Sequence, residues 1–292
     1  VEVITAADIP GVNDCGSIIH DDPILCDGEI RYVGQPLFAV IARSRDAARR
    51  AAALARAAAT ISGLAPVVTP RKAQELGQYV MPPMHLERST REGGARAAMD
   101  AAPHRLKGSF DVGGQEQFYL EGQISYATPK EDGAVHIHCS TQHPSEMQHL
   151  VAHALGVASH SVHVECRRMG GGFGGKESQS ALFACVAAVA ATRLQKPVKL
   201  RLDRDDDFMI TGKRHPFAYD YDVGFDGDGR ITGLTLDMMA NCGFSADLSG
   251  PVCDRAVFHA DNAYYLSDVV IRSFRCKTNL QSHTAFRGFG GP

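Results

Sequence analysis

The sequence of 292 residues lacks closely spaced cysteines. It contains eight cysteines, but no two of them form a Cys-x-x-Cys pair, and most lie within apolar runs. Because zinc sites and iron–sulfur clusters usually take their ligands from such pairs, we predict that these cysteines are buried free thiols. Any redox centre would then be a bound cofactor or belong to another chain.

Long apolar runs, a strong charge excess and a signal peptide are missing as well. No apolar stretch reaches the length of about 20 residues that spans a bilayer, so no membrane segment is expected. The net charge is −3 and the basic residues are scattered, which argues against nucleic-acid binding. The first residues, "VEVITAADIP", do not resemble a signal peptide. We expect a cytoplasmic protein, and because the chain starts without Met we also expect an upstream segment.

The sequence does contain alternating strand and helix patterns. Residues 29–42 predict two short strands, residues 44–60 predict an alanine-rich helix capped by Ser44, and residues 65–68 predict a returning strand. Together they indicate a small α/β domain over residues 1–75.

Residues 76–104 show no periodicity and predict a connecting segment along a surface. A second α/β domain is expected over residues 105–292. Its expected elements are strands at 134–140, 161–166 and 196–203, helices at 144–155 and 177–194, and a hairpin over 217–243 that turns at 226–229.

The stretch "RRMGGGFGGK", residues 167–176, has five glycines in six positions. It matches a P-loop through Lys176, but Glu177 stands where the magnesium-binding Ser or Thr belongs. It also matches a dinucleotide fingerprint, for which the first acidic candidate, Asp203, comes too late. The glycines predict instead that backbone N–H groups converge on an anionic or oxygen-rich group, with Phe173 projecting and Glu177 beginning the next helix.

Three other groups could bind metals but favour surface roles. His149 and His153 are four residues apart on a helix without the Glu of a zinc protease. His136 and His138 alternate along a strand and are interpreted as surface residues on one face. Residues 205–207 are three aspartates beside arginines, which indicates a solvated turn or salt-bridge cluster.

Five motifs in order carry a family resemblance over essentially the whole chain. They are "RYVGQP", "GGQEQFYLE", "STQHP", "RRMGGGFGGKE" and "AFRGFGGP". Together they resemble the molybdopterin-binding subunit of the xanthine dehydrogenase and xanthine oxidase family. The resemblance implies a mixed α+β and α/β fold: a small hammerhead-like α/β domain followed by the first part of the large molybdopterin-binding domain.

The resemblance implies a molybdenum–molybdopterin cofactor whose metal is held by the pterin sulfurs, so no Cys or His cluster is required. By motif match, the residues that line the cofactor are Gln142, Gly172, Phe173, Gly174 and Arg287. Of these, Gln142, Phe173 and Arg287 are expected closest to the molybdenum without binding it directly.

The resemblance also implies four substrate contacts. Glu177 and Arg255 match the family's catalytic and purine-binding pair, and Phe173 and Phe289 match rings beside the substrate. Aldehyde oxidases of the same fold generally lack the Glu and Arg pair, so a purine is favoured over an aldehyde. Arginine can stabilise the negative charge that develops on the purine, and the carboxylate can accept or share a ring proton.

The implied reaction is oxidative hydroxylation of hypoxanthine and xanthine to urate with oxygen from water. Electrons would pass through [2Fe-2S] clusters and FAD, on other domains or subunits, to NAD⁺, in a dimer of heterodimers. The family's general-base glutamate belongs to a later segment than Pro292, so we expect a truncated chain that is inactive without the remainder of the subunit. The alternatives are an aldehyde or other N-heterocycle oxidase of this family, a P-loop-like nucleotide-binding protein, and an inert interaction fragment.

Overall fold

The computed structural model describes residues 1–291 and shows the mixed fold of helices and sheets that the sequence predicts. The chain forms two compact units, each assembled from separate segments. Unit 1 comprises residues 1–66, 117–212 and 279–281, and unit 2 comprises residues 67–116, 213–278 and those from Ser282 onward. No helix in the described part of the chain is long and apolar enough to cross a membrane.

Unit 1 begins with a two-stranded antiparallel sheet and a surface helix. These first elements are β1 (Glu2–Ile4), the 3-10 helix η1 (Ala6–Asp8), β2 (Ala39–Ile41) and α1 (Arg45–Ala58). The hydroxyl of Ser44 accepts a hydrogen bond from the backbone N–H of Ala47 at 3.3 Å, which confirms the predicted cap.

Two of the strands predicted near this helix do not form. Between residues 29 and 42 only β2 forms, because the side chain of buried Gln35 accepts the N–H of Arg31 at 2.7 Å and replaces a strand ladder there. Residues 65–68 form no strand. Pro66 lacks the N–H that a sheet ladder would need at that position.

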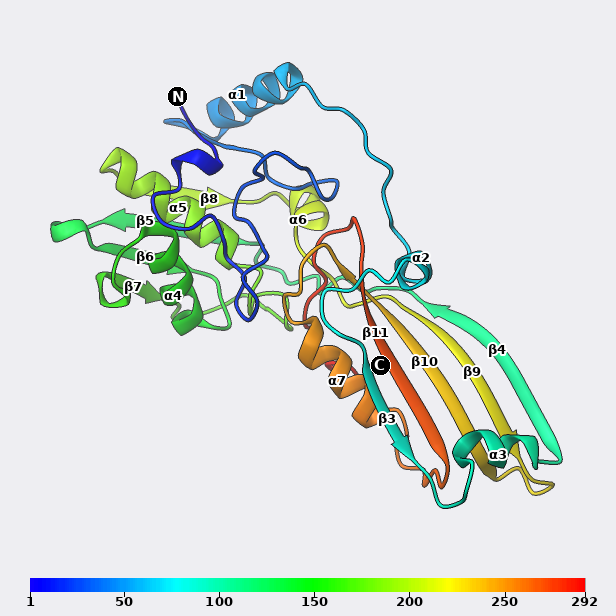
Figure 1. The fold of residues 1–292 in the computed structure, drawn as a ribbon. Helices are drawn as coiled ribbons and strands as arrows, with labels where there is room; N and C mark the ends of the chain where they lie inside the picture. Colours follow the sequence, from blue (N-terminus) through cyan, green and yellow to red (C-terminus); the bar gives the residue numbers. More distant parts are fainter. Residues whose placement is uncertain (292) are drawn as a thin grey trace. The chain divides into compact units, whose positions relative to one another are not determined.

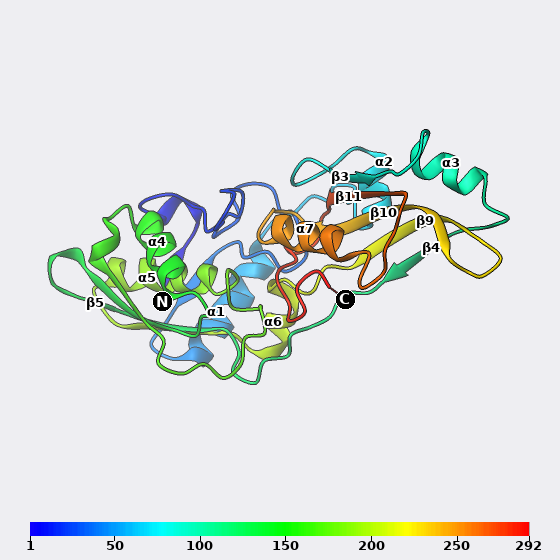
Figure 2. The same ribbon diagram turned by 90° about the horizontal axis from the view of Figure 1, so that it is seen from below.

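The main sheet of unit 1 has four strands in the order β7-β6-β5-β8. The elements of this part are β5 (Ile124–Pro129), η2 (Glu131–Gly133), β6 (Val135–Cys139), α4 (Pro144–Leu155), η3 (Ser159–Ser161), β7 (Val162–Glu165), α5 (Ala181–Leu194), β8 (Val198–Arg201) and α6 (Arg204–Ile210). Helices α4 and α5 cover one face of the sheet (Figures 1 and 2). The alternation in β6 buries Val135, Ile137 and Cys139 under these helices and leaves the other face open.

Helix α5 begins four residues later than predicted. It is almost wholly buried, as its apolar sequence indicates, but it starts at Ala181, so Glu177 lies in the turns before it. The reason is the carbonyl oxygen of Lys176, which accepts the N–H of Gln142 at 2.8 Å. That carbonyl is therefore committed to another segment of the chain.

Unit 2 is built on a five-stranded sheet in the order β3-β11-β10-β9-β4 (Figure 1). Its elements are α2 (Pro70–Glu75), β3 (Met84–Arg88), α3 (Gly94–Asp100), β4 (His104–Val112), β9 (Phe217–Phe225), β10 (Ile231–Gly243), α7 (Ser249–His259) and β11 (Val269–Lys277). Strands β10 and β11 are parallel and all other neighbours are antiparallel. The predicted hairpin is confirmed, and Asp226 closes its turn by accepting the N–H groups of Asp228 and Arg230, both at 2.9 Å.

Candidate cofactor and substrate site

The glycine loop of residues 167–176 joins β7 to the turns before α5. Phe173 (φ 54°) and Gly174 (φ 100°) lie in the left-handed region, and these two residues reverse the chain inside the loop. The Phe173 side chain projects from the loop, as predicted, since 45 % of its surface is exposed.

Backbone N–H groups of this loop converge on the side chain of Gln142. The N–H of Gly174 donates to Oε1 of Gln142 at 2.9 Å, and the N–H of Lys176 donates to the same oxygen at 3.2 Å. The sequence correctly predicts convergence of amides on an oxygen. The acceptor, however, is an internal amide and not an external anion.

Two glycines permit this close packing. A Cβ at Gly172 would lie 2.4 Å from Oε1 of Gln142, and one at Gly175 would lie 2.8 Å from Cε1 of Tyr119. Separations this short do not occur between real side chains, so a larger residue at either position would displace its neighbour. The glycines therefore hold the loop against Gln142 and Tyr119.

Lys176 is part of the core, which makes the P-loop alternative wrong. Its side chain is fully buried, and Nζ donates to the carbonyl oxygen of Glu121 at 2.6 Å and to the hydroxyl of Ser140 at 2.7 Å. Burial lowers the pKa of Lys176, and nearby Glu121 opposes that shift. A P-loop lysine must reach a phosphate, and this one is enclosed.

Glu177 follows the glycine loop directly, and its side chain lies next to that of Gln142. Nε2 of Gln142 is 3.5 Å from Oε1 of Glu177 and can donate to it. Because the loop amides fix Oε1 of Gln142, its NH₂ group is the part that can donate to a ligand. The structure therefore brings together the predicted residues of unit 1: Gln142, Gly172, Phe173, Gly174 and Glu177.

The remaining predicted residues lie in unit 2, where the second glycine loop packs on α7. A Cβ at Gly290 (φ 68°) would lie 2.9 Å from Cβ of Arg255, which is exposed on that helix. The loop is held by turns: the N–H of Phe289 donates to the carbonyl oxygen of Phe286 at 2.8 Å. The carbonyl oxygen of Arg287 accepts from Arg214 at 2.8 Å. Arg255, Arg287 and Phe289 thus form a second group.

Each group offers hydrogen-bonding and aromatic side chains and no cluster of metal ligands. Within residues 1–291, the single group of three His, Cys, Asp or Glu ligand atoms that could hold a metal ion is His136, His138 and Glu165, outside both loops. The loop residues therefore fit a cofactor that supplies its own metal ligands. Gln142 could hold such a cofactor by hydrogen bonding and Phe173 by packing.

Sequence reasoning missed the residues that anchor the loop. Thr141 donates from its hydroxyl to the carbonyl oxygen of Lys176 at 3.1 Å, and Ser140 accepts from the lysine itself. Both lie in the quoted motif "STQHP", in which only Gln142 was assigned a role. The signal that could have found them is a buried lysine after a glycine loop, since such a lysine needs oxygen partners.

The other sequence candidates divide into confirmed and corrected predictions. His149 and His153 are exposed on α4, as expected. For residues 205–207 the sequence predicts a solvated turn or a salt-bridge cluster. The turn is wrong, because these residues lie in α6 and Asp207 is buried, but Asp206 and Asp207 each form an ion pair with an arginine, which confirms the salt-bridge cluster. The hydroxyl of Tyr119 donates to Asp207 at 2.7 Å, which gives this carboxylate a structural partner. All eight cysteines are free and six are buried, which confirms the prediction of free thiols.

Comparison with known proteins agrees with this geometry. The family model of the molybdopterin cofactor-binding domain matches residues 77–292 of the sequence. The model of the a/b hammerhead domain of aldehyde oxidase and xanthine dehydrogenase matches residues 1–80. The fold and loops are thus those of a molybdopterin-binding oxidoreductase. The chain belongs to the xanthine dehydrogenase family.

Curated relatives of this family are similar over nearly the whole chain. Xanthine dehydrogenase of Drosophila subobscura is 43 % identical over 281 residues, and xanthine dehydrogenase/oxidase of Gallus gallus is 42 % identical over 290 residues. A nicotinate hydroxylase of Emericella nidulans is 39 % identical over 282 residues. These matches cover 96 %, 99 % and 96 % of the chain but only 20 % or 21 % of the relatives. The chain therefore spans about a fifth of their length.

Solved structures confirm the fold. Aldehyde oxidoreductase from Desulfovibrio gigas matches with a TM-score of 0.86 at 23 % identity, covering 99 % of this chain and 33 % of that one. Quinoline 2-oxidoreductase from Pseudomonas putida 86 matches with a TM-score of 0.82 at 22 % identity, covering 99 % of this chain and 38 % of that one.

Proposed function

We propose that the chain supplies part of the active site of a molybdenum hydroxylase that oxidises hypoxanthine and xanthine to urate. The observation that carries the proposal is the arrangement around Gln142. Its carbonyl oxygen is fixed by two loop amides, and its NH₂ group lies 3.5 Å from the carboxylate of Glu177. A fixed amide donor beside a carboxylate can donate to the cofactor while the carboxylate accepts a hydrogen bond from a purine ring N–H.

The cofactor, when bound, would supply the oxidation, with water as the source of oxygen. The chain's own residues would bind the cofactor and the substrate and hold them in orientation. Gln142 would donate a hydrogen bond to the cofactor, and Phe173 would pack beside it. Glu177 would accept or share a ring proton of the purine, and Arg255 would stabilise the negative charge that develops on it. Arg287 and Phe289 would line the cofactor and the substrate.

The proposal includes partners. In such an enzyme FAD and [2Fe-2S] clusters would reside on other domains or subunits and pass electrons to NAD⁺, in a dimer of heterodimers. The names of the Drosophila and Gallus relatives support a purine as substrate. The domain limits of 1–75, 76–104 and 105–292 and a cytoplasmic location remain predictions from the sequence.

A second candidate is hydroxylation of another nitrogen heterocycle. The Emericella nidulans relative is a nicotinate hydroxylase, and its identity of 39 % is close to that of the xanthine dehydrogenases. Glu177 favours the purine, because its carboxylate can accept a hydrogen bond from a purine ring N–H and nicotinate has none. Arg255 could pair with either substrate.

A substrate profile of the complete enzyme tests the proposal. Turnover of xanthine, nicotinate and an aromatic aldehyde would be compared for the wild type and for Glu177→Gln. We expect xanthine to be preferred and its kcat/KM to fall on the order of 10²-fold in the variant. Glu131→Gln, in η2 of the same unit, is the control and should match the wild type. Preference for nicotinate or the aldehyde, with no effect of Glu177→Gln, would refute the purine assignment.

A further inference from the structure

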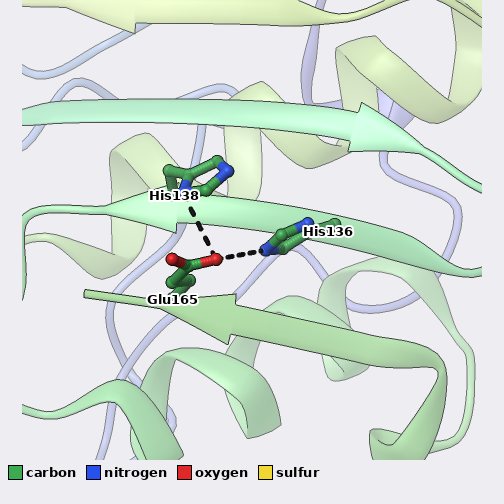
Figure 3. A group of neighbouring side chains, drawn as sticks. All are labelled: His136, His138 and Glu165. Atoms are coloured by element: carbon green, nitrogen blue, oxygen red, sulfur yellow. Dashed lines mark ion pairs between the residues drawn. The ribbon is translucent and has the colours of Figure 1, made fainter. Parts of the chain in front are cut away.

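The open face of the four-stranded sheet in unit 1 carries a cluster of histidines around one glutamate. The alternation of β6 places His136 and His138 on this face, opposite the helices. The parallel register of β7 sets His163 beside His136 and Glu165 beside His138. Figure 3 shows both β6 histidines directed toward the Glu165 carboxylate on the neighbouring strand.

The atoms that could bind a metal converge on a small volume. Oε2 of Glu165 is 3.2 Å from Nε2 of His136 and 3.8 Å from Nδ1 of His138, and all three atoms lie within 4.8 Å of one another. In a tetrahedral site with bonds of about 2.0 Å, ligand atoms are separated by roughly 3.3 Å. The 3.2 Å separation matches this spacing, and the 3.8 Å separation is slightly longer.

The surroundings orient the carboxylate of Glu165. Arg167 donates to Oε1 of Glu165 at 2.5 Å and leaves Oε2 directed at the histidines. Binding the second oxygen of a ligating carboxylate in this way fixes its orientation.

Solvent and ions can reach the cluster. His138 and Glu165 line a hollow of about 800 Å³ in unit 1. The hollow is also lined by Tyr126, Arg168 and Lys199. It gives a metal ion an entry path and room for water as a further ligand.

We propose that His136, His138 and Glu165 form a binding site for Zn²⁺ or a similar first-row divalent ion. Two imidazole nitrogens and one carboxylate oxygen are the protein ligands of open zinc sites, in which water completes the coordination. This mixture selects zinc, copper or nickel over Mg²⁺ and Ca²⁺, which prefer oxygen ligands. The three ligands lie outside the glycine loop, and the site does not depend on the proposed function.

Titration of the chain with metal tests the site directly. The chain would be freed of metal by a chelator, dialysed and titrated with Zn²⁺ by calorimetry, and then with Co²⁺ to record its visible spectrum. We expect one tight equivalent of Zn²⁺ and the intense absorption of four-coordinate Co²⁺. Mg²⁺ at the same concentration should not compete.

Variants identify the ligands. His136→Ala, His138→Ala and Glu165→Gln should each weaken Zn²⁺ binding at least tenfold. His160→Ala, an exposed histidine of η3 in the same unit, should leave it unchanged. His138 is half-exposed, so its variant decides the matter even if His136→Ala fails to fold. Absence of tight Zn²⁺ binding by the wild type, undiminished binding by His138→Ala and Glu165→Gln, or loss of binding in His160→Ala would overturn the proposal.

Discussion

The side-chain oxygen of Gln142 accepts the backbone N–H of Gly174 at 2.9 Å. This bond joins the turn after β6 to the glycine loop after β7, so the loop amide has a hydrogen-bond acceptor inside its own unit. The orientation of the Gln142 amide is set by the backbone and does not depend on a bound ligand. Such preorganisation is what a site needs if it is to hold a cofactor in one position.

Adding one methyl group at Gly172 should break this arrangement. The new Cβ would lie 2.4 Å from Oε1 of Gln142, so Gly172→Ala must displace the amide. We expect a loss of about 1 to 3 kcal/mol in the free energy of unfolding, measured by urea denaturation. We also expect less molybdopterin in the complete enzyme.

Gly63→Ala is the matched control, because nothing lies within 4 Å of its Cβ position and its φ is not positive. It should be neutral or slightly stabilising. Equal stability and cofactor content in both variants would show that the Gln142 contact is dispensable.

Replacing Lys176 should affect stability and not nucleotide binding. Lys176→Met leaves the carbonyl of Glu121 and the hydroxyl of Ser140 without their buried donor. We expect a loss of about 2 to 4 kcal/mol in the free energy of unfolding. Lys130→Met, at an exposed position of the same unit, should cost little. ATP should not raise the Tm of the wild type, and a rise that Lys176→Met removes would revive the P-loop alternative.

Arg255 should matter for turnover and not for folding. Because it is exposed on α7, Arg255→Met should leave the free energy of unfolding nearly unchanged. In the complete enzyme we expect kcat with xanthine to fall at least tenfold, because a cation would be lost where negative charge develops. Arg230→Met, in the exposed turn of the hairpin, is the control. Unchanged turnover would remove Arg255 from the mechanism.

Two buried histidines should make unit 2 sensitive to acid. Burial lowers the pKa of His283 to about 4, and that of His215 falls in the same direction. A histidine whose folded pKa is depressed favours folding above its ordinary pKa near 6.5, and this stability is lost as the pH falls toward the folded value. As the pH falls from the ordinary to the folded pKa, His283 alone should lower the free energy of unfolding by on the order of 3 kcal/mol.

Urea midpoints measured across this pH range test the prediction. His283→Gln should flatten the decline, while His104→Gln, an exposed histidine of the same unit, should not. A decline identical in all three proteins would assign the acid sensitivity to other groups.

The sequence predicted most of the regular elements because their patterns are local. Alanine spacing and a serine cap locate α1, and the "DGDG" turn locates the β9–β10 hairpin. The failures involve hydrogen bonds that the periodic patterns do not show. The Gln35 side chain bonds to Arg31, four positions back, in place of a strand ladder. The Lys176 carbonyl bonds to Gln142, 34 positions back, which delays the start of α5.

The candidate site was predictable only where a motif carried it. Family motifs located Gln142, Phe173 and Glu177, which the structure brings together from the turn after β6 and the glycine loop after β7. The motifs could not show that the loop amides donate hydrogen bonds to Gln142, because the partner of a backbone N–H depends on the fold. The same limit applies to Glu165, which joins His136 and His138 only through the register of β6 and β7.

The sheet of unit 2 constrains how the chain can fold during synthesis. Its edge strands, β3 and β4, are made first, whereas β9, β10 and β11, which lie between them, are made last. Neither edge strand therefore has a neighbour to pair with until the ribosome has passed residue 225 for β4 and residue 277 for β3. During that interval β3 and β4 expose unpaired backbone, and a nascent chain stalled before β9 would be a candidate for chaperone binding.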